Sequence, residues 1–303
     1  MMVIKRTRAS WAEPLAGCGV LHENEPMARH TTLAVGGPAR WLFRPAGESE
    51  LVRGMTLIPE DLPILPLGRG SNMLVPDAGF DGLVLDLSDL AALTITGRLV
   101  TAGAGVRMGK LAQQCANHGL TGLEFMATVP GDIGGGVAMN AGAFGQQVSD
   151  TLQSIRIVDR RGHTTEVPAS QLTMHYRYTT LPAGAIVLDA TFALQSGDAE
   201  AIRQRMRDMR AKRSDTQPLA WPNCGSVFKN PEGDHAARLV EAAGLKGYAI
   251  GGARISEVHA NFIVNDGSAK AADVLALIEK ARQEVRARFD IELEPEVRIV
   301  SQP

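Results

Sequence analysis

The sequence has 303 residues, of which 45% are hydrophobic and 21% charged, an ordinary composition for a globular protein of about two domains. Its formal net charge is −2 and it has no long basic run, so we expect no nucleic-acid partner. The cysteines, Cys18, Cys115 and Cys224, are far apart and form no Cys-x-x-Cys pair, which argues against a disulfide framework and against a zinc or other metal site.

The N-terminal segment "MMVIKRTRASWAEPL" is basic but lacks the apolar region of a secretory signal. No stretch of the sequence approaches the roughly 20 apolar residues that a membrane-spanning helix needs. We therefore expect a cytoplasmic enzyme or binding protein without a membrane segment.

The first predicted elements are short strands. Residues 30–45 predict a strand pair broken at Gly36-Gly37-Pro38, and residues 64–87 predict apolar strands separated by glycine turns. Residues 93–105 predict a hairpin whose turn lies at Gly97 and Arg98.

The middle of the chain alternates helices with strands. Apolar residues at helical spacing predict a helix over residues 106–118. A hairpin at 154–167 and a strand at 185–194 follow, and a charged helix is predicted from Ala199 to Arg213. The proline-containing segment after this helix resembles a domain boundary.

The C-terminal region predicts two helices and a final strand. Asp234 is the expected cap of the first helix and Ser268 of the second, longer helix. Alternating apolar residues predict a strand over 291–300. The fold class is therefore α+β, with a larger glycine-rich module followed by a smaller one.

One glycine pattern resembles a dinucleotide-binding fingerprint, because Gly103 and Gly105 lie between a predicted strand and a predicted helix. The spacing to Gly109 is too long, and the preceding elements are hairpins rather than a parallel βαβ unit. We interpret this pattern as a tight strand-to-helix turn.

Two other glycine-rich stretches are better candidates for a phosphate-bearing cofactor. They are "LGRGSNML" at 67–74 and "TVPGDIGGGVAMNAGAFG" at 128–145. Consecutive backbone N–H groups in such stretches can bind a pyrophosphate, although each stretch alone could be a structural turn. Neither contains the Walker pattern, so nucleoside triphosphate hydrolysis is not expected.

Eight motifs occur in the order found in UDP-N-acetylenolpyruvoylglucosamine reductases, which the sequence resembles from about residue 30 to residue 300. They are "HTTLAVGGPA", "GRGSNML", "GLEFMATVPGDIGGGVAMNAGAFG", "YRYT", "GSVFKNP", "AGLKG", "HANFIVN" and "LEPEVRIV". The resemblance implies a two-lobed FAD-binding module of the vanillyl-alcohol-oxidase type, followed by a smaller α+β substrate-binding domain. We expect FAD-binding lobes at 20–87 and 88–197 and the substrate-binding domain at 198–303.

The resemblance also implies a reaction. NADPH reduces the flavin, and the enolpyruvyl group of UDP-N-acetylglucosamine enolpyruvate then receives a hydride, which gives UDP-N-acetylmuramate for peptidoglycan. The short span between Arg177 and Ser226 is similar to that of type II members. No obligate protein partner is implied.

The implied catalytic residues are Arg177, Ser226 and Glu296. Ser226 lacks the Gly-x-Ser-x-Gly context of an acyl-transfer nucleophile and matches the family's proton donor. Arg177 would bind the substrate carboxylate with its guanidinium. Glu296 would polarise that carboxylate if it is held protonated, and whether it donates a proton or a hydrogen bond stays open.

The implied binding residues are more numerous. The expected FAD contacts are Gly68, Arg69, Gly70, Ser71, Asn72, Thr128, Pro130, Gly131, Ile133, Gly134, Gly135, Gly136, Ala141 and Gly142. The expected substrate contacts are Tyr176, Lys229, Asn230, His259 and Asn261, with Lys212 or Arg213 near the diphosphate. His259 and Asn261 could equally satisfy buried backbone groups.

Two positions need a separate comment. Asp132 occupies a place where the family often has serine, and a carboxylate beside phosphate is unfavourable, so we expect it to point away. Cys224 has no neighbouring base and is interpreted as a packing residue. The alternatives to a reductase are another flavin oxidoreductase on the same scaffold and a binding protein without turnover.

Overall fold

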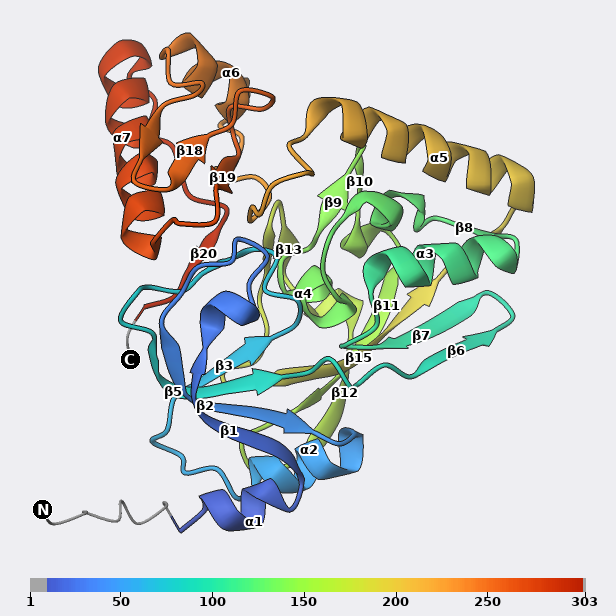
Figure 1. Cartoon of the computed structure of the whole chain (residues 1–303). Coiled ribbons are helices and arrows are strands. Elements are labelled where there is room, and N and C mark those ends of the chain that lie inside the picture. Colours follow the sequence, from blue (N-terminus) through green and yellow to red (C-terminus); the bar gives the residue numbers. More distant parts are fainter. Residues whose placement is uncertain (1–9, 302–303) are drawn as a thin grey trace, which may run out of the picture.

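The computed structural model describes residues 10–301, and its three parts can be followed by colour in Figure 1. Residues 1–9, which belong to the segment for which we expect no secretory signal, lie outside the described residues. None of the helices within residues 10–301 combines the length and apolar character that crossing a membrane requires.

The first lobe, residues 12–86, is a four-stranded sheet in the order β1-β2-β5-β3. β5 is parallel to both of its neighbours and is buried along nearly its whole length, as expected for a parallel strand covered on both faces. The elements are α1 (Ala12–Ala16), β1 (Gly19–Pro26), a 3-10 turn (Met27–Arg29), β2 (Pro38–Pro45), α2 (Glu48–Met55), β3 (Ile64–Leu67), β4 (Met73–Leu74) and β5 (Phe80–Asp86).

The second lobe, residues 93–196, is built on an antiparallel sheet in the order β12-β11-β15-β7-β6. Its strands are β6 (Leu93–Thr96), β7 (Leu99–Gly103), β8 (Leu120–Thr121), β9 (Gly142–Ala143), β10 (Gln146–Gln147), β11 (Leu152–Val158), β12 (Thr164–Pro168), β13 (Met174–His175), β14 (Tyr178–Thr179), β15 (Ile186–Ala193) and β16 (Gln195–Ser196). Its helices are α3 (Met108–Asn117), α4 (Ile133–Ala138) and 3-10 turns η2 (Glu124–Thr128), η3 (Val148–Asp150) and η4 (Ala169–Gln171).

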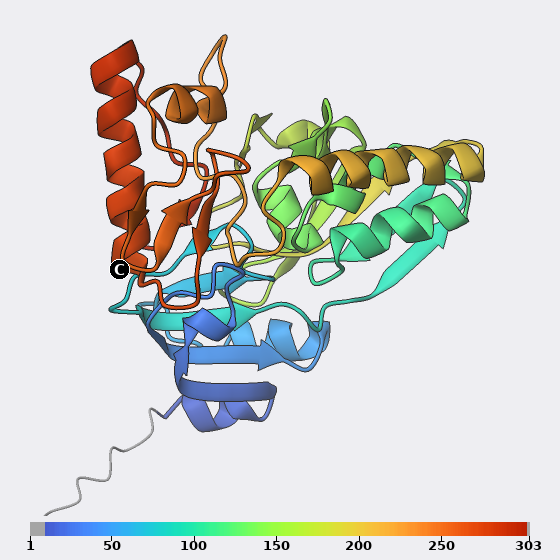
Figure 2. The same cartoon turned by 45° about the horizontal axis from the view of Figure 1, so that its top comes forward.

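Helix α5 (Ala199–Thr216) connects the second lobe to the C-terminal domain and lies beside α3 (Figures 1 and 2). Its buried residues Ile202 and Met206 join the core of the second lobe. The C-terminal domain then contains α6 (Ala236–Ala242), β17 (Ala249–Ile250), β18 (Ala253–Ile255), β19 (Ile263–Asn265), α7 (Ala271–Phe289) and β20 (Arg298–Ile299).

The C-terminal domain is attached to the first lobe by backbone pairing and by side-chain caps. β20 pairs in parallel with β4. The carboxylate of Asp77 accepts hydrogen bonds from the backbone N–H groups of Ala271 and Ala272 at 2.8 and 2.9 Å, which are the first residues of α7. The amide of Asn265 donates to the carbonyl of Leu33 at 2.9 Å. These contacts fix the smaller domain against the first lobe.

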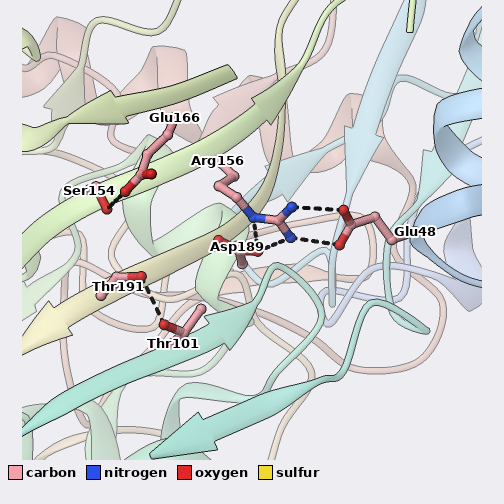
Figure 3. Close-up of polar contacts among 7 residues, drawn as sticks. All are labelled: Glu48, Thr101, Ser154, Arg156, Glu166, Asp189 and Thr191. Atoms are coloured by element: carbon pink, nitrogen blue, oxygen red, sulfur yellow. Dashed lines mark hydrogen bonds and ion pairs between the residues drawn. The ribbon is translucent and has the colours of Figure 1, made fainter. Parts of the chain in front are cut away.

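An arginine joins the two lobes, as Figure 3 shows. Arg156 on β11 donates to both carboxylate oxygens of Glu48 on α2, at 2.9 and 2.7 Å, and its Nε donates to Asp189 on β15 at 2.7 Å. Cross-strand contacts of Ser154 with Glu166 and of Thr101 with Thr191 tie the second sheet together in the same view. The lobes are therefore held by a charged contact as well as by apolar packing.

The α+β arrangement predicted from the sequence is confirmed, as are both hairpins and the helices that begin near residues 106 and 199. The strand pair predicted over 30–45 is wrong in its first half. Residues 30–37 form no strand because the chain turns through positive φ at Ala34 and Gly36. The antiparallel partner of β2 is β1, which was not predicted from the sequence, nor were α1 and α2.

Both predicted helix caps are wrong. Asp234 pairs with Arg238 and precedes the capping position, which is His235. Ser268 binds Asp266, and α7 is capped from another part of the chain by Asp77. Asp77 lies far from α7 in the sequence, so no local pattern could identify it as the cap.

The alternating strand predicted over residues 291–300 is also wrong. Only Arg298 and Ile299 form a strand, and Ile299 is 39% exposed although the alternation placed it on the apolar side. Pro295 interrupts the segment because proline has no N–H to donate to a ladder.

We predict that Asp77→Ala lowers the free energy of unfolding by about 1 kcal/mol, because two N–H groups at the start of α7 lose their acceptor. Urea unfolding of the two variants Asp77→Ala and Ser268→Ala provides the test. Ser268→Ala should change the free energy by less than about 0.5 kcal/mol. Equal losses in the two variants would contradict the capping role of Asp77.

Candidate active site

Ser226 lies in a turn whose backbone is fixed on both sides. Gly225 adopts φ +77°, a conformation that a side chain would strain, and its N–H donates to the Asn223 side chain at 3.0 Å. The N–H of Val227 donates to the carbonyl of Asn261 at 2.8 Å. Among residues 10–301, none hydrogen-bonds to the Ser226 hydroxyl, which leaves that hydroxyl available to a ligand.

Glu296 and Arg177 meet beside this turn. The backbone N–H of Glu296 donates to the carbonyl of Val227 at 2.7 Å. The Nε of Arg177 donates to Oε1 of Glu296 at 2.8 Å. The fold thus brings together Ser226 and Glu296 of the C-terminal domain and Arg177 of the second lobe, the three residues that the sequence analysis singled out as catalytic.

Arg177 is held in a strained conformation. It lies at φ +58° in the two-residue turn between β13 and β14, where a non-glycine residue costs on the order of 1–3 kcal/mol. Its Nη2 donates to the carbonyl of Gly142 at 2.9 Å, and its guanidinium lies 4.8 Å from the ring centroid of Tyr176. These contacts aim the guanidinium at Glu296.

Asn140 supports this hairpin and was not identified from the sequence. It is fully buried, and its Nδ2 donates to the carbonyl of His175 at 3.0 Å. Its Oδ1 accepts from the N–H of Ser149 at 2.9 Å, and the Thr179 hydroxyl donates to the carbonyl of Val137 at 2.6 Å. Only its place inside a glycine-rich motif could have drawn attention to Asn140.

Burial raises the pKa of Glu296 above its ordinary value, while Arg177 and Lys229 act in the opposite direction. Only 14% of the Glu296 side chain is exposed. Burial also raises the pKa of the neighbouring Cys224 thiol to about 12, so this cysteine stays neutral and inert.

The residues expected to bind substrate have different surroundings. Tyr176 is 47% exposed beside Arg177, and Lys229 pairs with Glu294. Asn230 accepts a hydrogen bond from the N–H of Ala236 at 3.1 Å, at the start of α6. His259 accepts from the N–H of Asn261 at 3.3 Å, and burial lowers the pKa of its imidazole.

Asn261 is turned toward its own chain. Its side chain is 4% exposed, accepts from the N–H of Phe228 at 2.9 Å and donates to the carbonyl of Phe228 at 2.8 Å. Both polar atoms are engaged, so Asn261 braces the turn that carries Ser226.

A polar cavity of about 510 Å³ lies beside the loop of residues 67–74. Gly68, Arg69, Arg107 and Asp132 are among its lining residues. Within residues 10–301, neither Arg69 nor Arg107 forms an ion pair, whereas Arg44 in the same cavity pairs with Asp86 at 2.7 Å. Two unpaired guanidinium groups in one cavity are suited to a diphosphate.

The two glycine-rich stretches contact each other. The Ser71 hydroxyl donates to the carbonyl of Pro130 at 3.1 Å. A Cβ at Gly70 would lie 2.1 Å from the carbonyl oxygen of His30, so only glycine fits there. Asn72 points elsewhere and donates to the carbonyl of Glu296 at 3.1 Å.

The second stretch does not form the expected row of free amides. The N–H groups of Ile133, Gly134 and Gly136 donate to the carbonyls of Val106, Ala104 and Asp132 at about 2.9 Å each, and residues 133–138 are helix α4. Thr128 donates its hydroxyl to Phe125 at 2.7 Å, and the Ala141 N–H donates to Gly136 at 2.8 Å. These N–H groups are engaged within the protein and are not available to an anion.

The expectation that Asp132 points away from this region is contradicted, because Asp132 lines the cavity. The interpretation of Gly103 and Gly105 as a strand-to-helix turn agrees with the structure. β7, which precedes α3, pairs antiparallel with β15 and β6 and belongs to no parallel βαβ unit. The arginine pair, the cavity and the glycine contact at residue 70 together fit a dinucleotide cofactor such as FAD.

Comparison with known proteins gives the same picture. Residues 39–168 match the FAD binding domain family, and residues 217–300 match the UDP-N-acetylenolpyruvoylglucosamine reductase C-terminal domain. The UDP-N-acetylenolpyruvoylglucosamine reductase of Alkalilimnicola ehrlichii is 46% identical over 285 residues, 94% of this chain and 96% of that protein. The reductase of Caldanaerobacter subterraneus subsp. tengcongensis is 40% identical over 94% of this chain and 95% of its own.

A solved structure is similar over nearly the same range. The crystal structure of UDP-N-acetylenolpyruvylglucosamine reductase from Thermus caldophilus superposes with a TM-score of 0.80 at 34% identity. The match covers 92% of this chain and 97% of the other.

We predict that Asn261→Ala lowers the free energy of unfolding by about 2 kcal/mol, because the N–H and carbonyl of Phe228 would be buried without partners. The measurement is urea unfolding. Asn117→Ala, which removes an exposed amide of α3, is the matched control and should change stability by less than about 0.5 kcal/mol. Unchanged stability with weaker substrate binding would instead make Asn261 a substrate contact.

Proposed function

The chain belongs to the UDP-N-acetylenolpyruvoylglucosamine reductase family, and from this premise we propose how its residues perform the reaction. The protein is an FAD-dependent oxidoreductase that uses NADPH to reduce the enolpyruvyl group of UDP-N-acetylglucosamine enolpyruvate. The product, UDP-N-acetylmuramate, is a precursor of peptidoglycan. The observation that carries the residue assignments is the contact of Arg177 with Glu296 beside the Ser226 turn.

The substrate group is a vinyl ether conjugated to a carboxylate. Bound FAD would supply hydride chemistry, with NADPH as the source of the hydride that the terminal carbon of this group receives. Negative charge then develops on the adjacent carbon and on the carboxylate, so the site must stabilise an anion and deliver one proton to carbon.

We propose that Ser226 delivers this proton. A serine hydroxyl is a weak acid, but an enolate-like carbanion is basic enough to take its proton. The proposal is supported by the fixed backbone on both sides of Ser226 and by the absence of any hydrogen-bond partner for its hydroxyl among residues 10–301.

Arg177 is proposed to bind the substrate carboxylate and to stabilise the developing charge. Its guanidinium stays charged at every relevant pH and can grip a carboxylate through two parallel hydrogen bonds. Glu296 is proposed to donate a hydrogen bond to the same carboxylate in its neutral form. The raised pKa of Glu296 supports this role, because burial favours the protonated acid.

The remaining binding residues follow from their positions. We propose that residues 68–72 and 128–142 surround FAD, with Arg69 and the newly identified Arg107 near its diphosphate. Tyr176, Lys229, Asn230 and His259 are proposed to contact the sugar nucleotide. Lys212 is the better candidate for the substrate diphosphate, since Arg213 donates to the Thr128 carbonyl and to Gln217. Asn261 is proposed to brace the Ser226 turn.

The division into lobes at 20–87 and 88–197 and a substrate-binding domain at 198–303 is retained as part of the proposal. It is supported by two hydrophobic clusters. One belongs to the second lobe with α5, and the other belongs to the C-terminal domain together with Leu33, Val35 and Leu74 of the first lobe. Helix α5, although counted in the last unit, packs on the second lobe. We further propose that the enzyme works in the cytoplasm on small-molecule substrates without an obligate protein partner.

We predict that Ser226→Ala leaves the reduction of bound FAD by NADPH nearly unchanged. The subsequent reaction with the enolpyruvyl sugar nucleotide should slow by on the order of 10² to 10⁴ fold, because the carbanion loses its proton donor. Anaerobic stopped-flow absorbance separates the two half-reactions. Ser214→Ala, at an exposed position of α5, serves as the control, and a Ser226→Ala enzyme with full activity would remove Ser226 from the mechanism.

We predict that Arg177→Lys also fails in the second half-reaction, by on the order of 10² fold, because an ammonium group cannot form the paired hydrogen bonds of a guanidinium. Arg207→Lys, at an exposed ion pair with Glu200, should behave as the native enzyme. Turnover of Arg177→Lys within a few fold of native would show that charge alone is sufficient at this position.

A further inference from the structure

Asp132 occupies an unusual position for an aspartate. It precedes α4 at the N-cap, where an aspartate side chain normally accepts a hydrogen bond from the first turn of the helix. Here the side chain makes no such bond, and only its backbone carbonyl accepts, from the N–H of Gly136. The side chain instead lines the cofactor cavity.

One oxygen of this carboxyl group is without a partner. Asp132 is 4% exposed, and its Oδ1 has no hydrogen bond to any residue within 10–301. Its Oδ2 lies close to Gly68, because a Cβ added to that glycine would be 3.1 Å from this oxygen. A buried carboxyl oxygen without a donor is costly, which indicates that a ligand group completes this site.

The charges around Asp132 come from several elements. Burial raises the pKa of Asp132 to about 6. Arg69, which precedes β4, and Arg107, which precedes α3, act in the opposite direction but do not outweigh burial. Asp86 on β5 adds to the rise, although it is itself paired with Arg44.

Other charged groups line the same cavity farther along. Asp89 is exposed, and Arg29 and His30 both face Glu25, at 3.9 and 3.0 Å. Arg69 and Arg107 are therefore the cations left to attract a ligand anion, and Asp132 is the buried carboxyl group that the anion would meet.

We propose that Asp132 takes up a proton when the diphosphate of FAD binds and donates a hydrogen bond to a phosphate oxygen, so that FAD is held less tightly as the pH rises. This proposal rests on the proposed function, because it assigns the cavity to the cofactor. The protonated acid fills the role that a serine hydroxyl could fill at this position. It gives the unpartnered oxygen a hydrogen bond and removes the repulsion between carboxylate and phosphate.

The direction of the pH dependence follows from the protonation state of the free site. Below about pH 6 Asp132 already carries the proton, so FAD affinity should be constant. Above that pH the proton must be taken up on binding, and the dissociation constant should rise with a slope approaching tenfold per pH unit. If Asp132 were instead ionised and accepted a hydrogen bond from a ribityl or ribose hydroxyl, the dissociation constant would fall as the pH rises.

The test measures FAD dissociation from the holoenzyme by ultrafiltration and absorbance, between about pH 5.5 and about pH 8.5. Native protein should release more FAD as the pH rises. Asp132→Asn and Asp132→Ser should release FAD independently of pH. At about pH 8 they should hold it on the order of a hundredfold more tightly than the native protein, because an amide or a hydroxyl donates at every pH. Asp89→Asn, an exposed carboxylate of the same cavity, should keep the native slope.

Three results would overturn the proposal. Native protein could hold FAD equally well at every pH, Asp132→Asn could keep the native slope, or Asp132→Asn could bind FAD more weakly than native at high pH. In each of these cases the protein still binds FAD, so the proposed function stands. A protein that binds no FAD at any pH would contradict the proposed function and this proposal together.

Discussion

Glu296 contacts all three parts of the molecule at once, and the site depends on this residue being held in place. Its N–H binds the Val227 carbonyl in the C-terminal domain, its carbonyl accepts from Asn72 in the first lobe, and its carboxylate pairs with Arg177 in the second lobe. Small shifts between the parts would therefore separate the Ser226 turn from Arg177. The polar contacts at the domain boundaries restrict such shifts.

These contacts also explain how strain can be maintained at the site. Arg177 keeps a left-handed backbone conformation that an isolated hairpin would leave, and the bonds of its side chain to Gly142 and Glu296 offset that cost. Asn140 fixes the backbone at the adjacent His175. Because the strain is offset by contacts from other segments, the guanidinium is already oriented before a substrate arrives.

The sequence was informative where structure depends on neighbouring residues. Alternation and glycine turns predicted the hairpins, and helical spacing predicted α3 and α5, because these patterns are local. The errors arose where distant segments decide the outcome. Asp77 caps a helix that begins nearly two hundred positions later in the sequence. Pro295 forms an isolated antiparallel bridge with Phe228, and the segment around it is irregular where a regular strand was predicted.

The candidate site was predicted in a different way. The roles of Arg177, Ser226 and Glu296 came from motifs shared with a known family, whereas residue spacing alone would have left them as turn and surface residues. No local pattern indicated that Asn72 bonds Glu296, that Asn140 supports Arg177 or that Arg107 reaches the cofactor cavity. Such relations depend on tertiary packing, which a single sequence does not display.

The pairing of β20 with β4 has a consequence for how the protein is made. Strand β4 follows the loop that lines the polar cavity, and its partner β20 lies more than two hundred residues later in the sequence. During synthesis the first lobe leaves the ribosome long before β20 is made, so the edge of β4 stays unpaired until then. Closing a contact of such large sequence separation is slow, which makes it a late step of folding. A nascent chain can therefore acquire its sheets early, but it can complete the contacts around Glu296 only after the segment that contains β20 has been made.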